Sequence, residues 1–361
     1  MSAPLLVIAA GGTGGHMFPA QSLAEEMLNL GWRVKLSTDD RGARYAGGFP
    51  DVVEREVVQA STFARGGLKA KLIAPFKIMS GIGSARSAMR KDRPSVVVGF
   101  GGYPALPAMA AAQSLGIPRM IHEQNGVLGR VNKAFATRVQ TVACSVWPTE
   151  LPKGARAVHT GNPVRQVIRE VAASPYPSFA GDLNILVIGG SQGATILSET
   201  VPLALAHLPQ ELRERLVVSH QARDADHELA VAAYETAEIR ADVQPFFEDV
   251  PERLVASHLV ISRSGASSIA DISAVGRPSI LVPLAMAIRD EQTANAQGLV
   301  QAGAGVLVTE NDLKERLSGE IETILGDEPR AIEMAKAATA QGRPDAVDRL
   351  KEEVLKLVET S

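Results

Sequence analysis

The feature that most constrains the fold of this chain is a glycine-rich stretch that directly follows an apolar run near the N-terminus. Residues 5–10 are all aliphatic, and residues 11–16 read Gly-Gly-Thr-Gly-Gly-His. This order predicts a buried strand, a loop almost without side chains, and a helix that begins near Phe18 and continues over residues 19–30. Such a loop suits a phosphate, a diphosphate or a developing negative charge, because glycines admit close approach and helix N-termini present free N–H groups. A tight turn in an α/β domain is the alternative interpretation.

The same arrangement recurs further along the chain. Glycine-rich stretches occupy residues 99–104 and 189–194, and each follows another apolar run. Further apolar runs of strand length lie at residues 184–188, 216–219, 259–262 and 279–282. Strands that alternate with helices are typical of parallel α/β sheets, and here the pattern starts twice. Pro163 biases Asn162 away from helix, so we predict a junction between two domains at this point.

Length and composition agree with this organisation and exclude several protein classes. A chain of 361 residues is long enough for two separate cores. The single cysteine, Cys144, cannot form an intrachain disulfide and suits a reducing compartment. Residues 1–10 lack the features of a signal peptide. No transmembrane helix is predicted, because proline and glycine interrupt the long apolar run near residues 104–117.

Charge is unevenly distributed along the chain. The net charge is −3, yet residues 61–93 hold eight basic residues and one acid, so this segment carries +7 and the remainder −10. Within it, residues 68–79 place Leu72, Phe76 and Met79 on one helical face. Ile73, Lys69 and Lys71 flank that face. Together these six residues form the predicted membrane patch. We expect an interfacial helix that meets anionic lipid, with an ordinary core-facing helix as the alternative.

Polar residues follow another predicted strand at residues 117–121. They read His-Glu-Gln-Asn at residues 122–125, at the edge of a parallel sheet where ligands bind. No second histidine stands at 126, so a zinc-binding helix is not indicated. Asp224 and Asp226 have a spacing known from metal sites, but we expect them at a helix start, where acids favour the dipole. We therefore predict no metal at this pair.

Seven short stretches, taken together and in order, resemble the MurG family of GT-B glycosyltransferases over nearly the whole chain. They lie at residues 11–16, 99–103, 122–125, 161–165, 189–193, 263–266 and 290–296. The resemblance implies an α/β fold of GT-B architecture, with two Rossmann-like parallel-sheet domains facing a cleft. Residues 1–162 would form the acceptor and membrane-facing domain, and residues 163–343 the domain that binds UDP-N-acetylglucosamine. A terminal helix at residues 344–361 would pack back on the first domain.

The resemblance also implies a reaction. An inverting transfer would move N-acetylglucosamine from UDP-N-acetylglucosamine to the 4-hydroxyl of undecaprenyl-diphospho-N-acetylmuramoyl-pentapeptide, converting lipid I to lipid II in peptidoglycan synthesis. No cofactor, metal or nucleic acid is implied. The expected location is peripheral, at the cytoplasmic face of the bacterial cell membrane, on an anionic surface.

Particular residues match the family's donor site. The resemblance implies that a set of residues binds UDP-N-acetylglucosamine. They are Thr13, Gly14, Gly15, Asn125, Arg165, Ser191, Phe247, Ala266, Ser267, Ser268, Asp271, Gln292 and Asn295. Ser191 would meet the diphosphate, Phe247 the uracil, and Asp271 the ribose diol. Two positions depart from the family's pattern, because glutamate is usual at Asp271 and a small residue or glycine at Arg223. We assign Arg223 no role on this basis.

The first domain would hold the acceptor and the catalytic base. Gly102 and Tyr103 are implied as acceptor-binding residues, and His16, His122 and Glu123 are the candidates for the base. His16 is preferred because imidazole titrates near neutrality and the residue belongs to the first glycine-rich stretch. The sequence leaves the choice among the three open.

Three other functions compete with this interpretation. A UDP-N-acetylglucosamine 2-epimerase shares the architecture and donor, but it needs no membrane patch at residues 65–79. A nicotinamide oxidoreductase is disfavoured, because its glycine fingerprint would require glycine where Met17 stands. A catalytically idle membrane scaffold would keep the patch but has no need for His16, Gln292 and Asn295 together.

Overall fold

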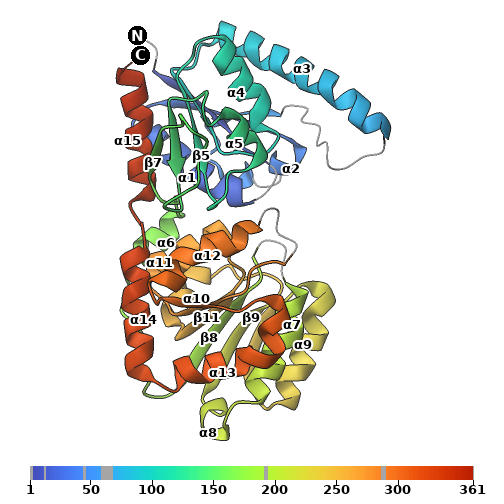
Figure 1. Cartoon of the computed structure of the whole chain (residues 1–361), viewed down its shortest axis with the longest axis vertical. Helices are drawn as coiled ribbons and strands as arrows, with labels where there is room; N and C mark the ends of the chain where they lie inside the picture. The colour runs from blue at the N-terminus through green and yellow to red at the C-terminus, as the bar shows by residue number, and fades with distance from the viewer. Residues whose placement is uncertain are drawn as a thin grey trace. The chain divides into compact units, whose positions relative to one another are not determined.

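The computed structural model describes residues 3–11, 14–43, 46–57, 68–190, 194–285 and 290–360; the side chains of Arg41 and of residues 68–75 are outside this description. The chain divides into two compact units, of which unit 1 comprises Met1–Arg165 and Asp345–Ser361, and unit 2 comprises Gln166–Pro344. Both units are parallel α/β structures (Figure 1). The predicted α/β fold class with two parallel-sheet domains is confirmed.

Unit 1 is built on a seven-stranded sheet with the order β3-β2-β1-β4-β5-β6-β7, in which every pair is parallel. Its strands are β1 (Leu5–Ala9), β2 (Arg33–Thr38), β3 (Glu54–Val57), β4 (Val96–Gly99), β5 (Arg119–Glu123), β6 (Thr141–Cys144) and β7 (Ala157–His159). Its helices are α1 (Gly14–Asn29), α2 (Asp40–Ala43), α3 (Leu68–Lys91), α4 (Ala105–Ser114), α5 (Arg130–Phe135) and α15 (Ala346–Glu359), with a 3₁₀ turn at Ala46–Gly48.

Both faces of this sheet are covered, which explains why its central strands β1 and β4 have no polar side chains. Leu6 and Ile8 of β1 pack with α1 and α15, whereas Leu5 and Val7 point to the opposite core with α3, α4 and α5. The terminal helix α15 therefore belongs to unit 1, although the chain reaches it only after completing unit 2. Lys351 of α15 pairs with Glu26 of α1 across 3.0 Å.

Unit 2 repeats the plan with a six-stranded parallel sheet of order β10-β9-β8-β11-β12-β13. Its strands are β8 (Leu183–Ile188), β9 (Leu216–Gln221), β10 (Arg240–Gln244), β11 (Leu259–Ser262), β12 (Ser279–Leu281) and β13 (Gly305–Leu307). Its helices are α6 (Gln166–Glu170), α7 (Thr195–Ala206), α8 (Gln210–Arg213), α9 (Asp224–Thr236), α10 (Val250–Ala256), α11 (Ala266–Val275), α12 (Glu291–Gln301), α13 (Leu313–Leu325) and α14 (Glu328–Gln341), with a 3₁₀ turn at Glu310–Asp312.

The strand order reverses beside the first strand of each unit, which is where such sheets bind ligands at their carboxyl edge. In unit 1 the reversal separates β1 from β4, and in unit 2 it separates β8 from β11. A glycine-rich stretch follows β1 and another follows β8. The fold thus brings the loops after β1 and β4 to one topological switch point and the loop after β8 to the other.

The first helix differs from its predicted bounds. It begins at Gly14 instead of near Phe18, so Pro19 lies inside α1. Proline is common at the start of helices, and this preference misplaced the predicted boundary. As a result, His16 is the third residue of α1 and does not belong to the loop itself.

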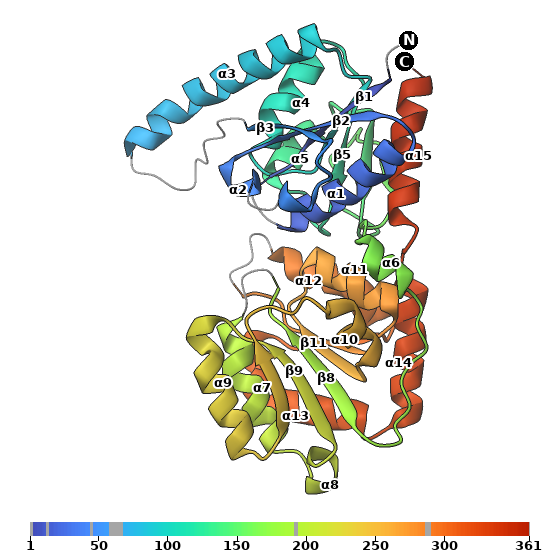
Figure 2. The same ribbon diagram turned by 180° about the vertical axis from the view of Figure 1, so that it is seen from behind.

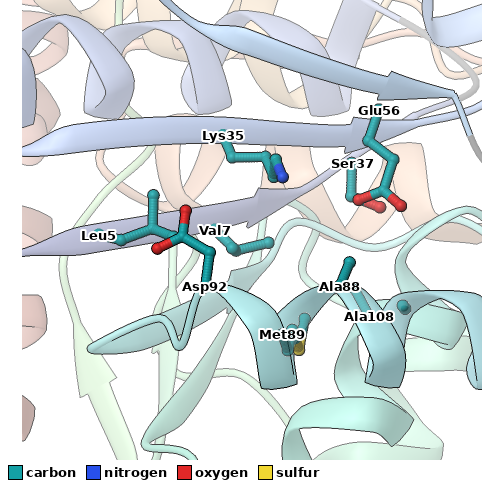
Figure 3. A pocket seen from close by; sticks show the side chains of 10 residues that line it. Leu5, Val7, Lys35, Ser37, Glu56, Ala88, Met89, Asp92 and Ala108 are labelled. Carbon is teal, nitrogen blue, oxygen red and sulfur yellow. The ribbon is translucent and has the colours of Figure 1, made fainter.

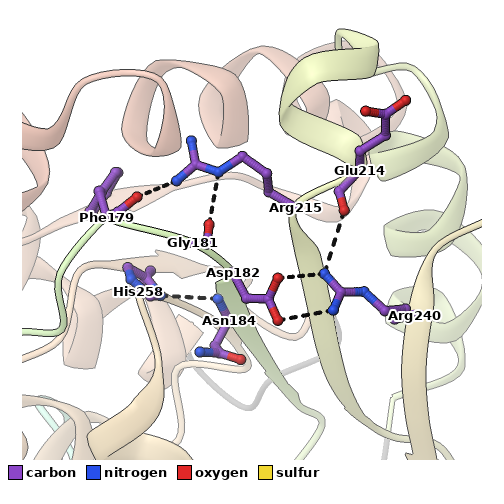
Figure 4. Close-up of polar contacts among 8 residues, drawn as sticks. All are labelled: Phe179, Gly181, Asp182, Asn184, Glu214, Arg215, Arg240 and His258. Carbon is purple, nitrogen blue, oxygen red and sulfur yellow. Dashed lines mark hydrogen bonds and ion pairs between the residues drawn. The ribbon is translucent and has the colours of Figure 1, made fainter.

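An ion pair and contacts to backbone carbonyls hold the amino edge of the unit 2 sheet. Arg240 donates to both carboxylate oxygens of Asp182, at 2.9 and 2.7 Å, and Arg215 donates to the carbonyls of Phe179 and Gly181 (Figure 4). The Asn184 N–H donates to Nδ1 of His258 at 3.0 Å. This edge lies at the opposite end of the strands from the glycine-rich stretch, so it offers reference residues that are remote from the candidate site.

One small cavity of unit 1 lies between the sheet and the helices α3 and α4. Its lining includes Val7, Lys35, Ser37, Met89 and Asp92 (Figure 3). Its volume of about 10 Å³ accommodates one water molecule and no sugar nucleotide. Among the described residues, no helix combines the length and the apolar character that crossing a membrane requires.

Candidate active site

The loops after β1 and β4 interlock at the carboxyl edge of unit 1. Gly102 has a φ of +74°, and a Cβ at this position would lie 2.9 Å from the carbonyl oxygen of Gly11. A side chain here would both strain the backbone and separate the two loops. The neighbouring Tyr103 is half-buried. The structure therefore places the predicted acceptor residues Gly102 and Tyr103 beside the first glycine-rich stretch; Thr13 lies outside the described residues.

His16 projects from the first turn of α1 toward the loop after β4. Gly101 has a φ of +93°, and a Cβ there would lie 3.3 Å from Nε2 of His16 and 3.3 Å from Nδ2 of Asn132. Burial lowers the pKa of His16 below its ordinary value of 6.5, while a hydrogen bond with the Gly11 backbone acts in the opposite direction. The imidazole is therefore mainly neutral at pH 7, which is the form that can accept a proton.

His122, at the end of β5, has partners at both ring nitrogens. Nδ1 lies 3.0 Å from Nε2 of Gln124, and Nε2 lies 3.2 Å from both the Gly161 carbonyl and Oγ of Ser145. The side chain is fully buried, and burial lowers the pKa of His122 to about 4. With Gln124 donating to Nδ1, the Nε2–H group donates to Gly161. This geometry connects β5 to the segment after β7 and favours a structural role for His122.

Glu123 organises the turn that follows β5. Its Oε2 accepts hydrogen bonds from the Gly129 N–H at 2.8 Å and from Asn132 at 2.9 Å. Its Oε1 accepts from the N–H of Asn125 at 3.1 Å. Burial raises the pKa of Glu123, although these hydrogen bonds oppose the shift. Both carboxylate oxygens are thus engaged, and the predicted donor residue Asn125 is held in place by the adjacent carboxylate.

Asn132 is a site residue that the sequence interpretation missed. It lies on α5, is almost fully buried, and donates to the carbonyl of His122 at 3.1 Å as well as to Glu123. The available signal was an amide between two apolar residues, Val131 and Phe135, that face the core. Such a polar residue on a buried helical face usually has specific partners.

In unit 2, α11 carries four of the predicted donor residues just after β11. Ala266, Ser267, Ser268 and Asp271 occupy its first two turns. The Ser267 hydroxyl is buried without a hydrogen-bond partner among the described residues, so it retains bonding capacity for a ligand. Ser191 lies outside the described residues.

The amides of α12 tie that helix to the strand ends. Oε1 of Gln292 accepts from the Leu284 N–H at 3.0 Å, and Nδ2 of Asn295 donates to the carbonyl of Ser264 at 3.1 Å. Both predicted sugar-reading residues therefore help to shape the loops after β11 and β12. Asn295 is buried, whereas Gln292 is half-buried.

Phe247, the predicted uracil contact, packs against an arginine side chain. Phe247 is almost fully buried, and the Arg253 guanidinium covers one face of its ring at 3.9 Å from the ring centre. The adjacent Phe246, which the sequence interpretation passed over, is 64% exposed.

Arg165, another predicted donor residue, belongs to unit 1. It is the last residue of the first segment of unit 1, and its guanidinium lies 5.6 Å from the ring centre of Phe18.

The possible metal pair takes the helix-start position expected from the sequence. Asp224 is the first residue of α9, and the carboxylate of Asp226 accepts hydrogen bonds from Thr195 and Arg223. These two donors engage Asp226, and Asp224 stands at the helix start, where an acid favours the dipole.

Comparison with protein families and known proteins covers nearly the whole chain. The model of the glycosyltransferase family 28 N-terminal domain matches residues 6–144, and that of the family 28 C-terminal domain matches residues 184–350. The UDP-N-acetylglucosamine--N-acetylmuramyl-(pentapeptide) pyrophosphoryl-undecaprenol N-acetylglucosamine transferase of Maricaulis maris is 48% identical, over 98% of this chain and 97% of its own. The protein of the same name from Caulobacter vibrioides is 45% identical over 98% of both chains.

Solved structures agree with this relationship. MurG of Acinetobacter baumannii matches with a TM-score of 0.80 and 29% identity, over 98% of this chain and 99% of that one. A putative UDP-N-acetylglucosamine 2-epimerase from Listeria monocytogenes matches with a TM-score of 0.72 over 100% and 98% of the two chains, but its 15% identity supports a shared fold alone. The architecture is GT-B, as the resemblance implied. This chain belongs to the MurG family of glycosyltransferases, within glycosyltransferase family 28.

Proposed function

We propose that this enzyme transfers N-acetylglucosamine from UDP-N-acetylglucosamine to the 4-hydroxyl of undecaprenyl-diphospho-N-acetylmuramoyl-pentapeptide. The observation that carries the proposal is 43–48% identity, over nearly the full length, to relatives whose names state a transfer of this kind. The two family 28 domain matches support the same glycosyl transfer chemistry.

The chemistry calls for a base at the acceptor hydroxyl and for stabilisation of the departing diphosphate. We assign the base to His16, which has a lowered pKa and lies beside the loop that carries Gly102 and Tyr103. The acceptor hydroxyl gives its proton to the neutral imidazole as its oxygen attacks the anomeric carbon, and UDP leaves with the electrons of the sugar–phosphate bond. In unit 2, the N-termini of α7 and α11 supply N–H groups to the diphosphate.

An incubation without acceptor separates this transferase from an epimerase of the same fold. The enzyme should leave UDP-N-acetylglucosamine unchanged until a soluble, short-chain analogue of the lipid acceptor is added, and then release UDP. Accumulation of the C2-epimerised sugar nucleotide in the absence of acceptor would favour the epimerase and overturn the proposal.

Asp271 offers a prediction about the ribose. Asp271→Ala should raise the KM for the donor because the ribose diol loses its acceptor, a loss of roughly 1–3 kcal/mol, or about 5- to 150-fold. Asp271→Glu should keep or improve affinity, because glutamate is usual at this position in the family. Calorimetric titration with UDP measures both variants, with Asp182→Ala at the remote sheet edge as control. If both Asp271 variants bind UDP like the parent, the ribose does not contact this side chain.

We further propose that α3 docks on the cytoplasmic face of an anionic membrane. Phe76 and Met79 are 78% and 68% exposed and stand three residues apart, so they share one face of the helix. Lys77 is also exposed. The first turns of α3 extend beyond the neighbouring α4 (Figure 2). The other predicted members of the patch, Lys69, Lys71, Leu72 and Ile73, lie on the same helix, but their side chains are outside the described set.

Vesicle co-sedimentation tests this docking surface. Binding should require anionic lipid and weaken at high salt, because each nearby lysine contributes about 1 kcal/mol through a screened attraction. The Phe76→Ser, Met79→Ser double variant should bind several-fold more weakly, whereas Leu203→Ser, which alters an exposed leucine of unit 2, should bind like the parent. Equal binding to neutral vesicles, or no binding to either kind, contradicts the proposal.

A further inference from the structure

Three side chains join the first turns of α7 and α9 at the carboxyl edge of the unit 2 sheet. The Arg223 Nε–H donates to Oδ2 of Asp226 at 2.8 Å, and its NH2 group contacts Oγ1 of Thr195. The Thr195 hydroxyl donates to the same Asp226 oxygen at 3.1 Å. We refer to Arg223, Asp226 and Thr195 as the α7–α9 clamp.

The clamp lies where small displacements affect the donor site. Thr195 is the first residue of α7, and Asp226 is the third residue of α9. Because β8 and β9 are neighbouring parallel strands, the two helices begin side by side at the same edge. The clamp therefore fixes the position and direction of the α7 N-terminus. In the proposed function, the N–H groups of this N-terminus bind the diphosphate.

The charges of the clamp identify Arg223 as a positioning group. The Asp226 side chain is only 9% exposed and already receives two donors, so its charge is balanced locally. The guanidinium of Arg223 is 47% exposed, but it directs its Nε–H and NH2 donors to Asp226 and Thr195. A planar guanidinium bridges two such acceptors in a defined geometry, which a lysine ammonium does less well.

We propose that Arg223 is a positioning residue for the donor, acting through Thr195 to hold the N-terminus of α7 in its diphosphate-binding position. The inference rests on the proposed function, and it gives a role to an arginine that replaces the small residue usual in the family. The clamp would serve donor binding and not the proton transfer, which belongs to unit 1.

Binding and kinetics of three variants test the clamp, with UDP as the probe. Arg223→Ala should raise the Kd for UDP and the KM for the donor by about two- to tenfold, the scale of a weakened anion contact at a helix N-terminus. The kcat and the acceptor KM should stay within twofold of the parent. Arg223→Lys should recover part of the affinity. Asp226→Asn should weaken UDP binding in the same direction, because it releases the same clamp.

Arg240→Ala is the matched control, because it breaks an arginine–aspartate pair at the remote edge of the same sheet (Figure 4). It should bind UDP like the parent. Tighter UDP binding by Asp226→Asn would mean that a released Arg223 contacts the phosphates directly, which overturns the clamp. Unchanged UDP binding by Arg223→Ala, or an equal loss in Arg240→Ala, also overturns it. A parent that fails to bind UDP would instead contradict the proposed function itself.

Discussion

His16→Ala should lower kcat by roughly 10²–10⁴-fold and leave the Kd for UDP nearly unchanged. That range is the usual contribution of a positioned general base. His16 lies in the first turn of α1, where burial lowers its pKa and thereby keeps the imidazole neutral. The helix dipole acts in the same direction. Steady-state kinetics at saturating donor and acceptor would measure the loss, and calorimetry would measure UDP binding.

The pH profile distinguishes a base from a residue that only shapes the loop. In the parent, kcat should fall on the acidic side as His16 becomes protonated, and His16→Ala should lack this limb. His207→Ala, which alters an exposed histidine at the end of α7, should keep the parent profile. A parent-like kcat in His16→Ala, combined with a nearly inactive Glu123→Gln, would move the base to the turn after β5.

Acid should destabilise both units through buried histidines. Burial lowers the pKa of His122 in unit 1 and of His220 in unit 2 to about 4, against an ordinary value of 6.5. The unfolded chain therefore binds protons at these groups at a higher pH than the folded chain does. The stability that each neutral histidine contributes is present above pH 6.5 and is lost as the pH falls toward 4. Each loss amounts to about 3 kcal/mol in the free energy of unfolding.

Urea denaturation at pH 7, 5.5 and 4.5 would measure this effect. Carboxylates also contribute to acid unfolding, so the informative quantity is the difference between the parent and a His220→Asn variant. That variant loses the contacts of His220 with Tyr234 and Ser198, so it should be less stable at pH 7, yet its stability should depend less on pH. An unchanged pH dependence in His220→Asn would show that His220 does not titrate in this way.

The doubly repeated α/β organisation could be predicted because strands buried on both faces need continuous apolar runs. β1 is buried along its whole length, and the glycine-rich stretch after it has few alternatives to a strand–loop–helix turn. The start of α1 could not be located from the same residues, since Pro19 signals a helix N-terminus by local preference, whereas the surrounding structure accommodates it inside the helix.

The candidate site was predictable as a set of residue types but not as a set of contacts. His122, Glu123 and Asn125 were singled out because they follow a strand, and the structure does bring them together. Their individual roles depend on partners from other elements, such as the Gly161 carbonyl, which lies 39 residues from His122 in the sequence. A local pattern does not contain such pairings. Hence the sequence left three candidates for the base, and our proposal of His16 rests on its place beside Gly101 and on its lowered pKa.

Arg223 is a residue whose contacts the sequence could not predict. The sequence marked it only as a departure from the family's pattern, because a small residue or glycine is usual at this position. Its contact with Thr195 spans 28 residues and depends on the adjacency of β8 and β9. Only the fold places this arginine at the N-terminus of α7.

The glycosyl transfer itself is tested most directly by following radiolabelled N-acetylglucosamine from UDP-N-acetylglucosamine to a short-chain lipid I analogue. UDP release is measured in parallel, and excess EDTA is present in one arm. We expect equal amounts of UDP and labelled lipid-linked disaccharide, a linkage at the 4-hydroxyl of the muramoyl residue, and full activity with EDTA. UDP release without labelled lipid product would contradict the transfer, and activity that is lost in EDTA and restored only by Mg²⁺ or Mn²⁺ would contradict its metal-free form.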